Sequence, residues 1–165
     1  MPGTTLYANF WRDSQSIIDS GDPVNYVALA TAQHPIHLLQ VIGATPPPAN
    51  CTPNVPPPNN CPDQVVPNSA TQALITASAY GPEPLAQIKA GQAPLVSNPN
   101  GIRGYVNFIE GDHGSVIDDK VPPVTAEMQT EAISFVGAAI PPVIPLPGTT
   151  PGTTLLLANP TVIQP

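Results

Sequence analysis

Two polar side chains follow apolar segments of this sequence, and their types suit proton transfer. Asp63 lies in CPDQVVPN, downstream of the apolar run 35–43, and His113 lies in EGDHGS, just after the apolar run 102–109. A carboxylate that accepts a hydrogen bond from one imidazole nitrogen fixes the tautomer, so the other nitrogen can take a proton from a serine hydroxyl. The sequence therefore offers Asp63 and His113 as the acid and the base of a catalytic triad.

Neighbouring residues leave alternatives open. Asp112 and Asp118 are further candidates for the acid, but Asp112 adjoins His113 and is expected to cap the following turn. Ser115 is a candidate substitute nucleophile, although it shares the loop of the base and has no visible nucleophile elbow. The plain alternative is that His113 is an ordinary loop histidine and Asp63 a capping residue of a proline-flanked turn.

Two apolar runs predict the strands that position these residues. Residues 35–43 and 102–109 are too apolar for strands with one face in water, which indicates buried strands. Helical segments are expected before, between and after them. The alternation of strands and helices predicts an α/β fold with a short, mostly parallel sheet flanked by helices.

Helices are predicted at 9–20, 23–31, 70–79 and 125–139. The first of the two longer C-terminal helices has Asn68 or Ser69 as its cap, and the second has Thr125. Residues 44–62 and 81–100 are predicted to be loops, and residues 154–163 an added strand. The apolar face of the last helix is predicted to contain Met128, Ala132, Phe135, Val136 and Ala139.

The composition bounds the domain and its partners. A length of 165 residues suits a single domain, 1–165, with a sheet-and-helix core at 10–138 and a Pro-rich tail at 140–165. With 25 prolines and 12 glycines, much of the chain must be loop, with Pro-rich connections. A formal charge of −7 and four scattered basic residues argue against binding nucleic acid or an anionic membrane surface. No apolar run is long enough for a transmembrane segment, and the N-terminus has no signal-peptide pattern.

The cysteines and histidines do not predict a metal site. Cys51 and Cys61 lie in one Pro-rich loop, CTPNVPPPNNC, and form either a local disulfide or two free thiols. A disulfide would imply an oxidising compartment. His34 and His37 are three residues apart, which on a strand places them on opposite faces and disfavours shared metal binding.

Several motifs together resemble a known family. The strand HPIHLLQVIG, the loop PDQVVPN, the strand GYVNFIEGDHGS and the helix TAEMQTEAISF resemble the C-terminal part of bacterial extracellular lipases of the α/β-hydrolase superfamily. The resemblance covers about residues 10 to 138 and implies a partial α/β-hydrolase-like fold. Asp63 in D-Q-V-V-P matches the position of the family's acid, and His113 in D-H-G-S matches its histidine.

This resemblance implies an ester hydrolase, a lipase or esterase, that acts on an ester or lipid without a metal or organic cofactor. It also implies an extracellular or periplasmic location. The chain departs from the family because it contains no G-x-S-x-G elbow, and Ser14, Ser16 and Ser20 do not have a flanking glycine on both sides. We therefore expect a chain that forms a homo-oligomer or pairs with a complementing N-terminal fragment. The alternative is a non-catalytic interaction module.

Overall fold

The structure is a computed structural model, and it describes most of the chain. The described residues are 4–5, 8–10, 12–14, 21–51, 60–92, 95–97, 101–139 and 154–165, with side chains omitted at 95–97, 137–139 and 154–155. Residues 8–10 and 12–14 are helical, as predicted for 9–20, and the remainder of that segment lies outside the described residues.

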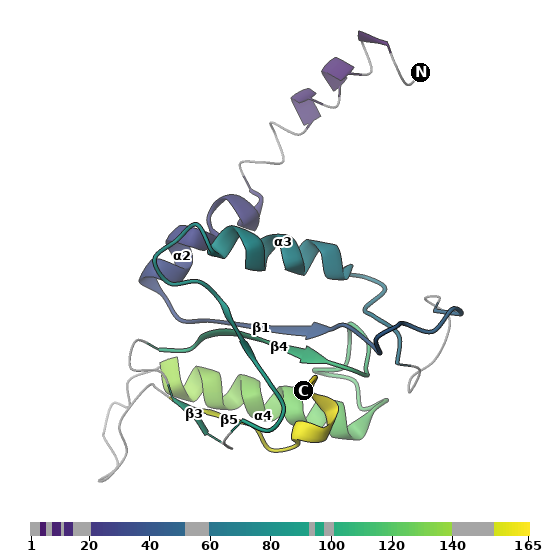
Figure 1. The fold of residues 1–165 in the computed structure, drawn as a ribbon, viewed down its shortest axis with the longest axis vertical. Coiled ribbons are helices and arrows are strands. Elements are labelled where there is room, and N and C mark those ends of the chain that lie inside the picture. Colours follow the sequence, from purple (N-terminus) through teal and green to yellow (C-terminus); the bar gives the residue numbers. More distant parts are fainter. Residues whose placement is uncertain are drawn as a thin grey trace.

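A three-stranded parallel sheet lies at the centre of the fold (Figure 1). Strands β1 (Ile36–Val41) and β4 (Arg103–Phe108) pair in parallel, and β2 (Ala86–Ile88) pairs with the other side of β4. The two predicted strands are confirmed, but β2 lies in a segment predicted to be loop. Gly104 explains how β2 approaches so closely, because a Cβ atom there would lie 2.9 Å from the Ala86 carbonyl oxygen.

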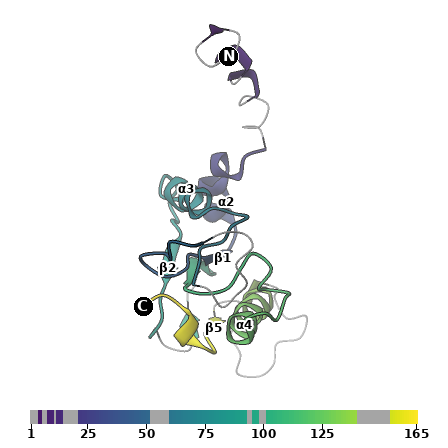
Figure 2. The same ribbon diagram turned by 90° about the vertical axis from the view of Figure 1, so that its right-hand side faces the viewer.

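Helices cover both faces of this sheet, so the predicted α/β class is confirmed. Figures 1 and 2 show α2 and α3 on one face and α4 on the other. A small antiparallel sheet of β3 and β5 lies beside α4. The remaining bounds are η1 Pro23–Asn25, α2 Val27–Gln33, α3 Asn68–Ser78, β3 Leu95–Ser97, α4 Pro122–Ala139, β5 Thr154–Leu156 and η2 Pro160–Val162.

Helix α4 begins before its predicted start. It starts at Pro122, because proline is preorganised for the first turn and needs no hydrogen bond from its nitrogen. Thr125 is therefore not the N-cap; its hydroxyl donates to the Asp118 carbonyl oxygen at 3.0 Å. The cap predicted for α3 is also wrong, since Pro67 precedes the helix and Asn68 is its first residue.

The tail differs from its prediction as well. Of the strand predicted at 154–163, only β5 forms, because Pro160 starts the short helix η2. The tail still reaches the main sheet. Ile163 makes a bridge with Phe108, and the Gln164 N–H donates to the Asn107 carbonyl oxygen at 2.8 Å.

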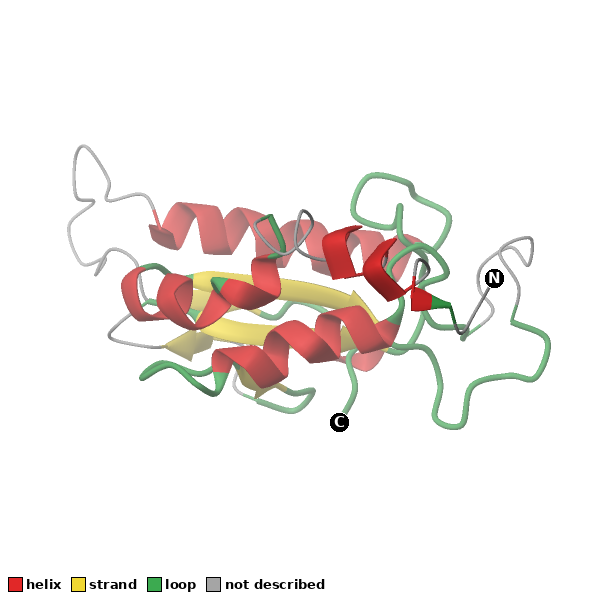
Figure 3. Cartoon of the chain, turned by 90° about the horizontal axis from the view of Figure 1, so that it is seen from above, coloured by secondary structure: helices red, strands yellow, loops and turns green. Residues whose placement is uncertain are grey.

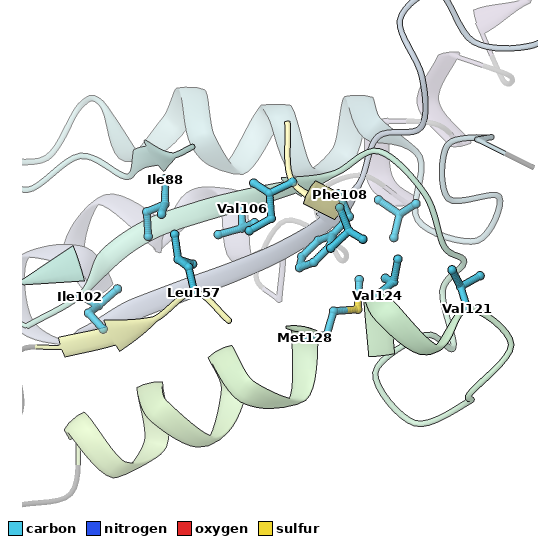
Figure 4. Packing of buried hydrophobic residues seen from close by; sticks show 11 residues of the cluster. Ile88, Ile102, Val106, Phe108, Val121, Val124, Met128 and Leu157 are labelled. Carbon is cyan, nitrogen blue, oxygen red and sulfur yellow. The ribbon is translucent and has the colours of Figure 1, made fainter. Parts of the chain in front are cut away.

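The hydrophobic core lies between the sheet and α4 (Figure 4). Val106 and Phe108 point into it from alternate positions of β4, and Val124 and Met128 meet them from α4. The predicted apolar face of α4 is only partly right. Met128 is buried, but Val136 is 51% exposed.

The carboxyl ends of β1 and β4 point to the same side of the molecule. Figure 3 shows long loops gathered there, beyond the ends of these strands. The loops after β1 and β4 carry Asp63 and His113. None of the described helices is long and apolar enough to cross a membrane.

Candidate active site

The structure brings Asp63 and His113 together. His113 Nδ1 and Asp63 Oδ2 are 3.0 Å apart, although the residues are 50 positions apart in the sequence. The Asp63 side chain is 11% exposed and the His113 side chain 53%. The pair thus has one mostly buried carboxylate and one imidazole that is open to solvent.

The turn after β1 fixes the Asp63 carboxylate. The Asp63 N–H donates to the Val41 carbonyl oxygen at 2.9 Å, which ties the turn to the end of the strand. Asp63 Oδ1 accepts from the backbone N–H groups of Val65 at 2.7 Å and Val66 at 3.1 Å. The turn therefore holds one carboxylate oxygen, and the other is directed at His113. Asp63 both caps its turn and binds the imidazole, so these two interpretations of the sequence are compatible.

A disulfide and a close backbone approach secure the segment before Asp63. Cys51 and Cys61 form the disulfide that the sequence left open, with their Cα atoms 5.5 Å apart. Gly43 contacts the far end of this loop so closely that a Cβ atom would lie 2.5 Å from the Asn60 carbonyl oxygen. Only glycine fits there, and its φ of 72° also favours glycine.

The loop after β4 is held by its own hydrogen bonds. Asp112 caps the turn as expected, since its Oδ1 accepts from the Gly114 N–H at 2.8 Å. The Ser115 hydroxyl accepts from the Asp112 N–H at 2.7 Å and is fully buried. A Cβ atom on Gly111, whose φ is 119°, would lie 3.0 Å from the Ser115 hydroxyl oxygen. His113 therefore sits on a tightly folded turn.

The other acidic residues of this loop bind a lysine instead of the histidine. Lys120 Nζ lies 2.7 Å from Asp118 Oδ2 and 3.3 Å from Asp112 Oδ2. The hydrogen bonds that Lys120 donates, first to Asp118 and then to Asp112, raise the pKa of Lys120. Within the described residues, neither of the two alternative acids forms a hydrogen bond or ion pair with the His113 side chain, whereas Asp63 does.

Ser115 does not reach His113 in this structure. Its hydroxyl is buried against Asp112, to which it also donates at 3.3 Å. His113 Nε2 has no hydrogen-bond partner among the described residues. The substitute nucleophile is thus not placed beside the base.

An apolar cavity adjoins the pair. It has a volume of about 210 Å³ and is bordered by both Asp63 and His113. The remaining lining residues come from β1, the two loops, α3 and α4. Most are apolar, namely Leu39, Val41, Val66, Val116 and Met128, and the polar ones are Gln40, Thr71 and Asp112. Such a cavity favours an uncharged carbon chain next to the imidazole.

The geometry allows general acid–base chemistry. An ionised Asp63 carboxylate can only accept, so it selects the neutral imidazole tautomer that has its proton on Nδ1 and its lone pair on Nε2. When Nε2 takes a proton, the neighbouring Asp63 carboxylate stabilises the imidazolium. The arrangement can therefore remove a proton from a hydroxyl group placed at Nε2 and return it later.

A second histidine–carboxylate pair, which was not predicted from the sequence, lies inside the protein. His37 Nε2 and Glu131 Oε2 are 2.7 Å apart, with side chains 2% and 0% exposed. Glu127, one turn earlier on α4, is also fully buried and accepts from the N–H groups of Ala158 and Asn159. The only sequence feature that could have indicated these buried glutamates is their spacing of four residues. This spacing puts Glu127 and Glu131 on the face of α4 that also carries buried Met128.

We expect the buried glutamate to make stability depend on pH. Burial raises the pKa of Glu131, and the hydrogen bond from His37 opposes that shift. A carboxyl whose pKa is raised by folding stabilises the fold below its unfolded pKa, about 4.3. That stability is lost as the pH rises through the higher folded pKa.

Glu131→Gln should flatten this decline, measured as the free energy of unfolding by urea titration from pH 4 to 7. The matched control, Glu83→Gln in the loop before β2, should show the same fall in the free energy of unfolding with pH as the wild type. An equal fall in the wild type and in Glu131→Gln would contradict the assignment of this pH dependence to Glu131.

Comparisons with known proteins do not assign this chain to a family. No protein-family model matches it, and searches of curated proteins and of solved structures found no match either. What the structure defines is an α/β protein with a histidine–aspartate pair at the carboxyl ends of adjacent parallel strands.

Proposed function

We propose that this chain supplies the acid and the base of a serine-type carboxylic ester hydrolase with an α/β-hydrolase-like fold. The observation that carries this proposal is the 3.0 Å hydrogen bond between His113 Nδ1 and Asp63 Oδ2. The pair lies beyond the carboxyl ends of adjacent parallel strands, where open α/β sheets place their sites. The order of acid and then histidine along the chain agrees with the lipase resemblance.

In this proposal His113 acts as base and then as acid. Nε2 takes the proton of a serine hydroxyl while the serine oxygen attacks the ester carbonyl carbon. The same proton then passes to the leaving alkoxide, which departs as an alcohol and leaves an acyl-enzyme. In the second half a water molecule gives a proton to Nε2 and attacks the acyl carbon. Nε2 then returns this proton to the serine oxygen as the bond to the acyl group breaks, which releases the acid and restores the serine hydroxyl. Asp63 holds the imidazole in the required tautomer in both halves.

The cavity supports an ester with an apolar acyl group as the substrate. Its volume of about 210 Å³ and its mostly apolar lining suit a short, uncharged acyl chain. No cofactor takes part in this chemistry. The Cys51–Cys61 disulfide is compatible with an extracellular or periplasmic location, where oxidised cysteines persist.

A fluorophosphonate that labels activated serines tests the proposal and locates the nucleophile. We expect one labelled serine after incubation of the wild-type protein, identified by peptide mass spectrometry. His113→Ala should abolish the labelling, because a serine without its base is a poor nucleophile. Equal labelling of the wild type and His113→Ala, or none in either, would overturn the serine mechanism.

The edge of β1 that pairs with no other described strand favours the second candidate, an interaction module. In the described part of the chain, β1 is an edge strand of the three-stranded sheet and pairs only with β4. The backbone groups of Ile36 and Ile42 face β4, so those of His37 and Leu39 face the other edge. Ile36 and Leu38 also border an apolar pocket of about 200 Å³ beside α2 and α3. A strand from another molecule could add at this edge and bury these side chains.

We therefore expect the chain to self-associate through β1. Light scattering should give a mass above that of one chain, since a long apolar edge strand is a template for pairing. Leu38→Lys should shift the protein towards monomer, because lysine on an edge strand opposes pairing. Ile117→Lys is the matched control, at a position that is 85% exposed on the His113 loop, and should leave the mass unchanged. A monodisperse wild-type monomer would contradict this expectation.

A further inference from the structure

A groove lined by carboxamide side chains lies on the face of the sheet opposite the core. Gln40 and Asn107 are directly paired across β1 and β4. Their neighbours Val41, Val106 and Phe108 point into the core beside α4, so side-chain alternation directs Gln40 and Asn107 towards α3. The groove has a volume of about 510 Å³, within the range of about 300–1,000 Å³ that is typical of ligand sites. Its other carboxamides are Asn68, Gln72 and Gln164.

Hydrogen bonds hold several of these carboxamides in place. Gln40 Nε2 donates to Asn68 Oδ1 at 3.1 Å, and Asn68 Nδ2 donates to the Ile42 carbonyl oxygen at 3.3 Å. On the other side, Asn107 Nδ2 donates to Gln164 Oε1 at 2.9 Å. These side chains are therefore oriented before any ligand arrives, which lowers the entropic cost of binding.

One acceptor in this group lacks a partner. Asn107 Oδ1 is buried and receives no hydrogen bond from the described residues. Native proteins satisfy the large majority of such atoms, so an unsatisfied one calls for a donor from beyond the described residues. Because this oxygen has almost no accessible surface, a hydroxyl group in the groove reaches it only when the Asn107 side chain turns towards the groove.

The remaining walls are neutral and partly apolar. The described lining residues carry no charged side chain, which disfavours a phosphate, a carboxylate or a metal ion as the ligand. Ile42, Pro47 and Pro62 add apolar surface. The wall at Pro62 is fixed, because the Ala44 N–H donates to the Asn60 carbonyl oxygen at 2.7 Å next to the Cys51–Cys61 disulfide.

We propose that this carboxamide groove binds a neutral saccharide. A carboxamide offers two donors and an acceptor in one plane, and sugar hydroxyls both donate and accept. The apolar wall suits the C–H faces of a sugar ring. Among the described lining residues, only Gln40 borders both this groove and the cavity at His113, so the groove is a site separate from the proposed ester hydrolysis.

Titration with maltotriose and cellotriose, followed by ¹H–¹⁵N NMR, tests the groove. At least one of the two should shift the signals of Asn68, Gln72 and Asn107. Gln72→Ala and Asn68→Ala should each weaken binding by about 2- to 10-fold, the equivalent of one lost hydrogen bond. Gln72→Ala is the variant expected to fold without difficulty. Within the described residues the Gln72 side chain makes only a long hydrogen bond, to Thr76 Oγ1 at 3.5 Å.

Two control variants show whether the saccharide binds in this groove and not elsewhere on the protein. Gln129→Ala, on α4 at the other face of the sheet, should bind the saccharide as the wild type does. His113→Ala should also bind it unchanged, so a failure of the ester hydrolase proposal does not affect the result. The inference is overturned if neither saccharide binds at about 10 mM, if both groove variants bind as the wild type does, or if only a blocked trialanine peptide shifts these signals.

Discussion

His113→Ala is expected to lower kcat/KM for p-nitrophenyl butyrate by a factor on the order of 10³ to 10⁴. The proposal makes Nε2 the only group that accepts and returns the proton, and removing a triad member has effects of this size or larger. The side chain is 53% exposed and its only partner among the described side chains is Asp63, so its loss should leave the fold intact. Initial rates across a range of substrate concentrations, with circular dichroism of both proteins, provide the measurement.

His34→Ala is the matched control for this experiment. His34 is an exposed histidine at the end of α2, away from the carboxyl ends of the strands. Its removal should leave kcat/KM within about twofold of the wild type, as is usual for surface substitutions. Equal rates for wild type and His113→Ala would show that His113 is not the base.

Asp63→Asn is expected to lower kcat by a factor on the order of 10³ to 10⁴ while the turn stays folded. Asparagine Oδ1 can still accept from the N–H groups of Val65 and Val66, so the local structure is kept. The amide nitrogen, however, can only donate to the imidazole, which favours the tautomer with its proton on Nε2. That tautomer cannot accept the serine proton.

NMR of the ¹⁵N-labelled imidazole measures this change directly. In the wild type the neutral ring should carry its proton on Nδ1, and in Asp63→Asn on Nε2. Asp119→Asn, at an exposed aspartate on the same loop as His113, is the control and should leave both the tautomer and kcat unchanged. A wild-type ring protonated on Nε2 would contradict the geometry of the pair.

The strands and the pair could be predicted from the sequence because their signals are local. The runs around β1 and β4 are apolar enough to indicate buried parallel strands, and the carboxyl ends of such strands share one edge of the sheet. That rule alone predicts that Asp63 and His113 lie on the same side of the molecule. The contact between the side chains also depends on the two backbone N–H groups that hold Asp63 Oδ1. The proline-flanked turn predicts that Asp63 caps it, but not that its other carboxylate oxygen is directed at His113.

Other features depend on contacts between distant segments. β2 has three residues, too few for a period to be visible, and it forms because Gly104 lets it approach β4. Glu127 and Glu131 look like solvent-facing residues in the sequence, yet one holds the backbone of Ala158 and Asn159 and the other binds His37. The carboxamide groove unites residues of β1, α3, β4 and the tail, so no local pattern could indicate it.

The double variant Asp63→Asn/His113→Ala tests the central claim most directly. If Asp63 acts only through the imidazole, then it has nothing left to contribute once His113 is gone. The account predicts that the double variant hydrolyses p-nitrophenyl butyrate as fast as His113→Ala alone, to within about twofold. A further loss in the double variant as large as that caused by Asp63→Asn in the wild type would show that the two residues act independently, and would contradict the account.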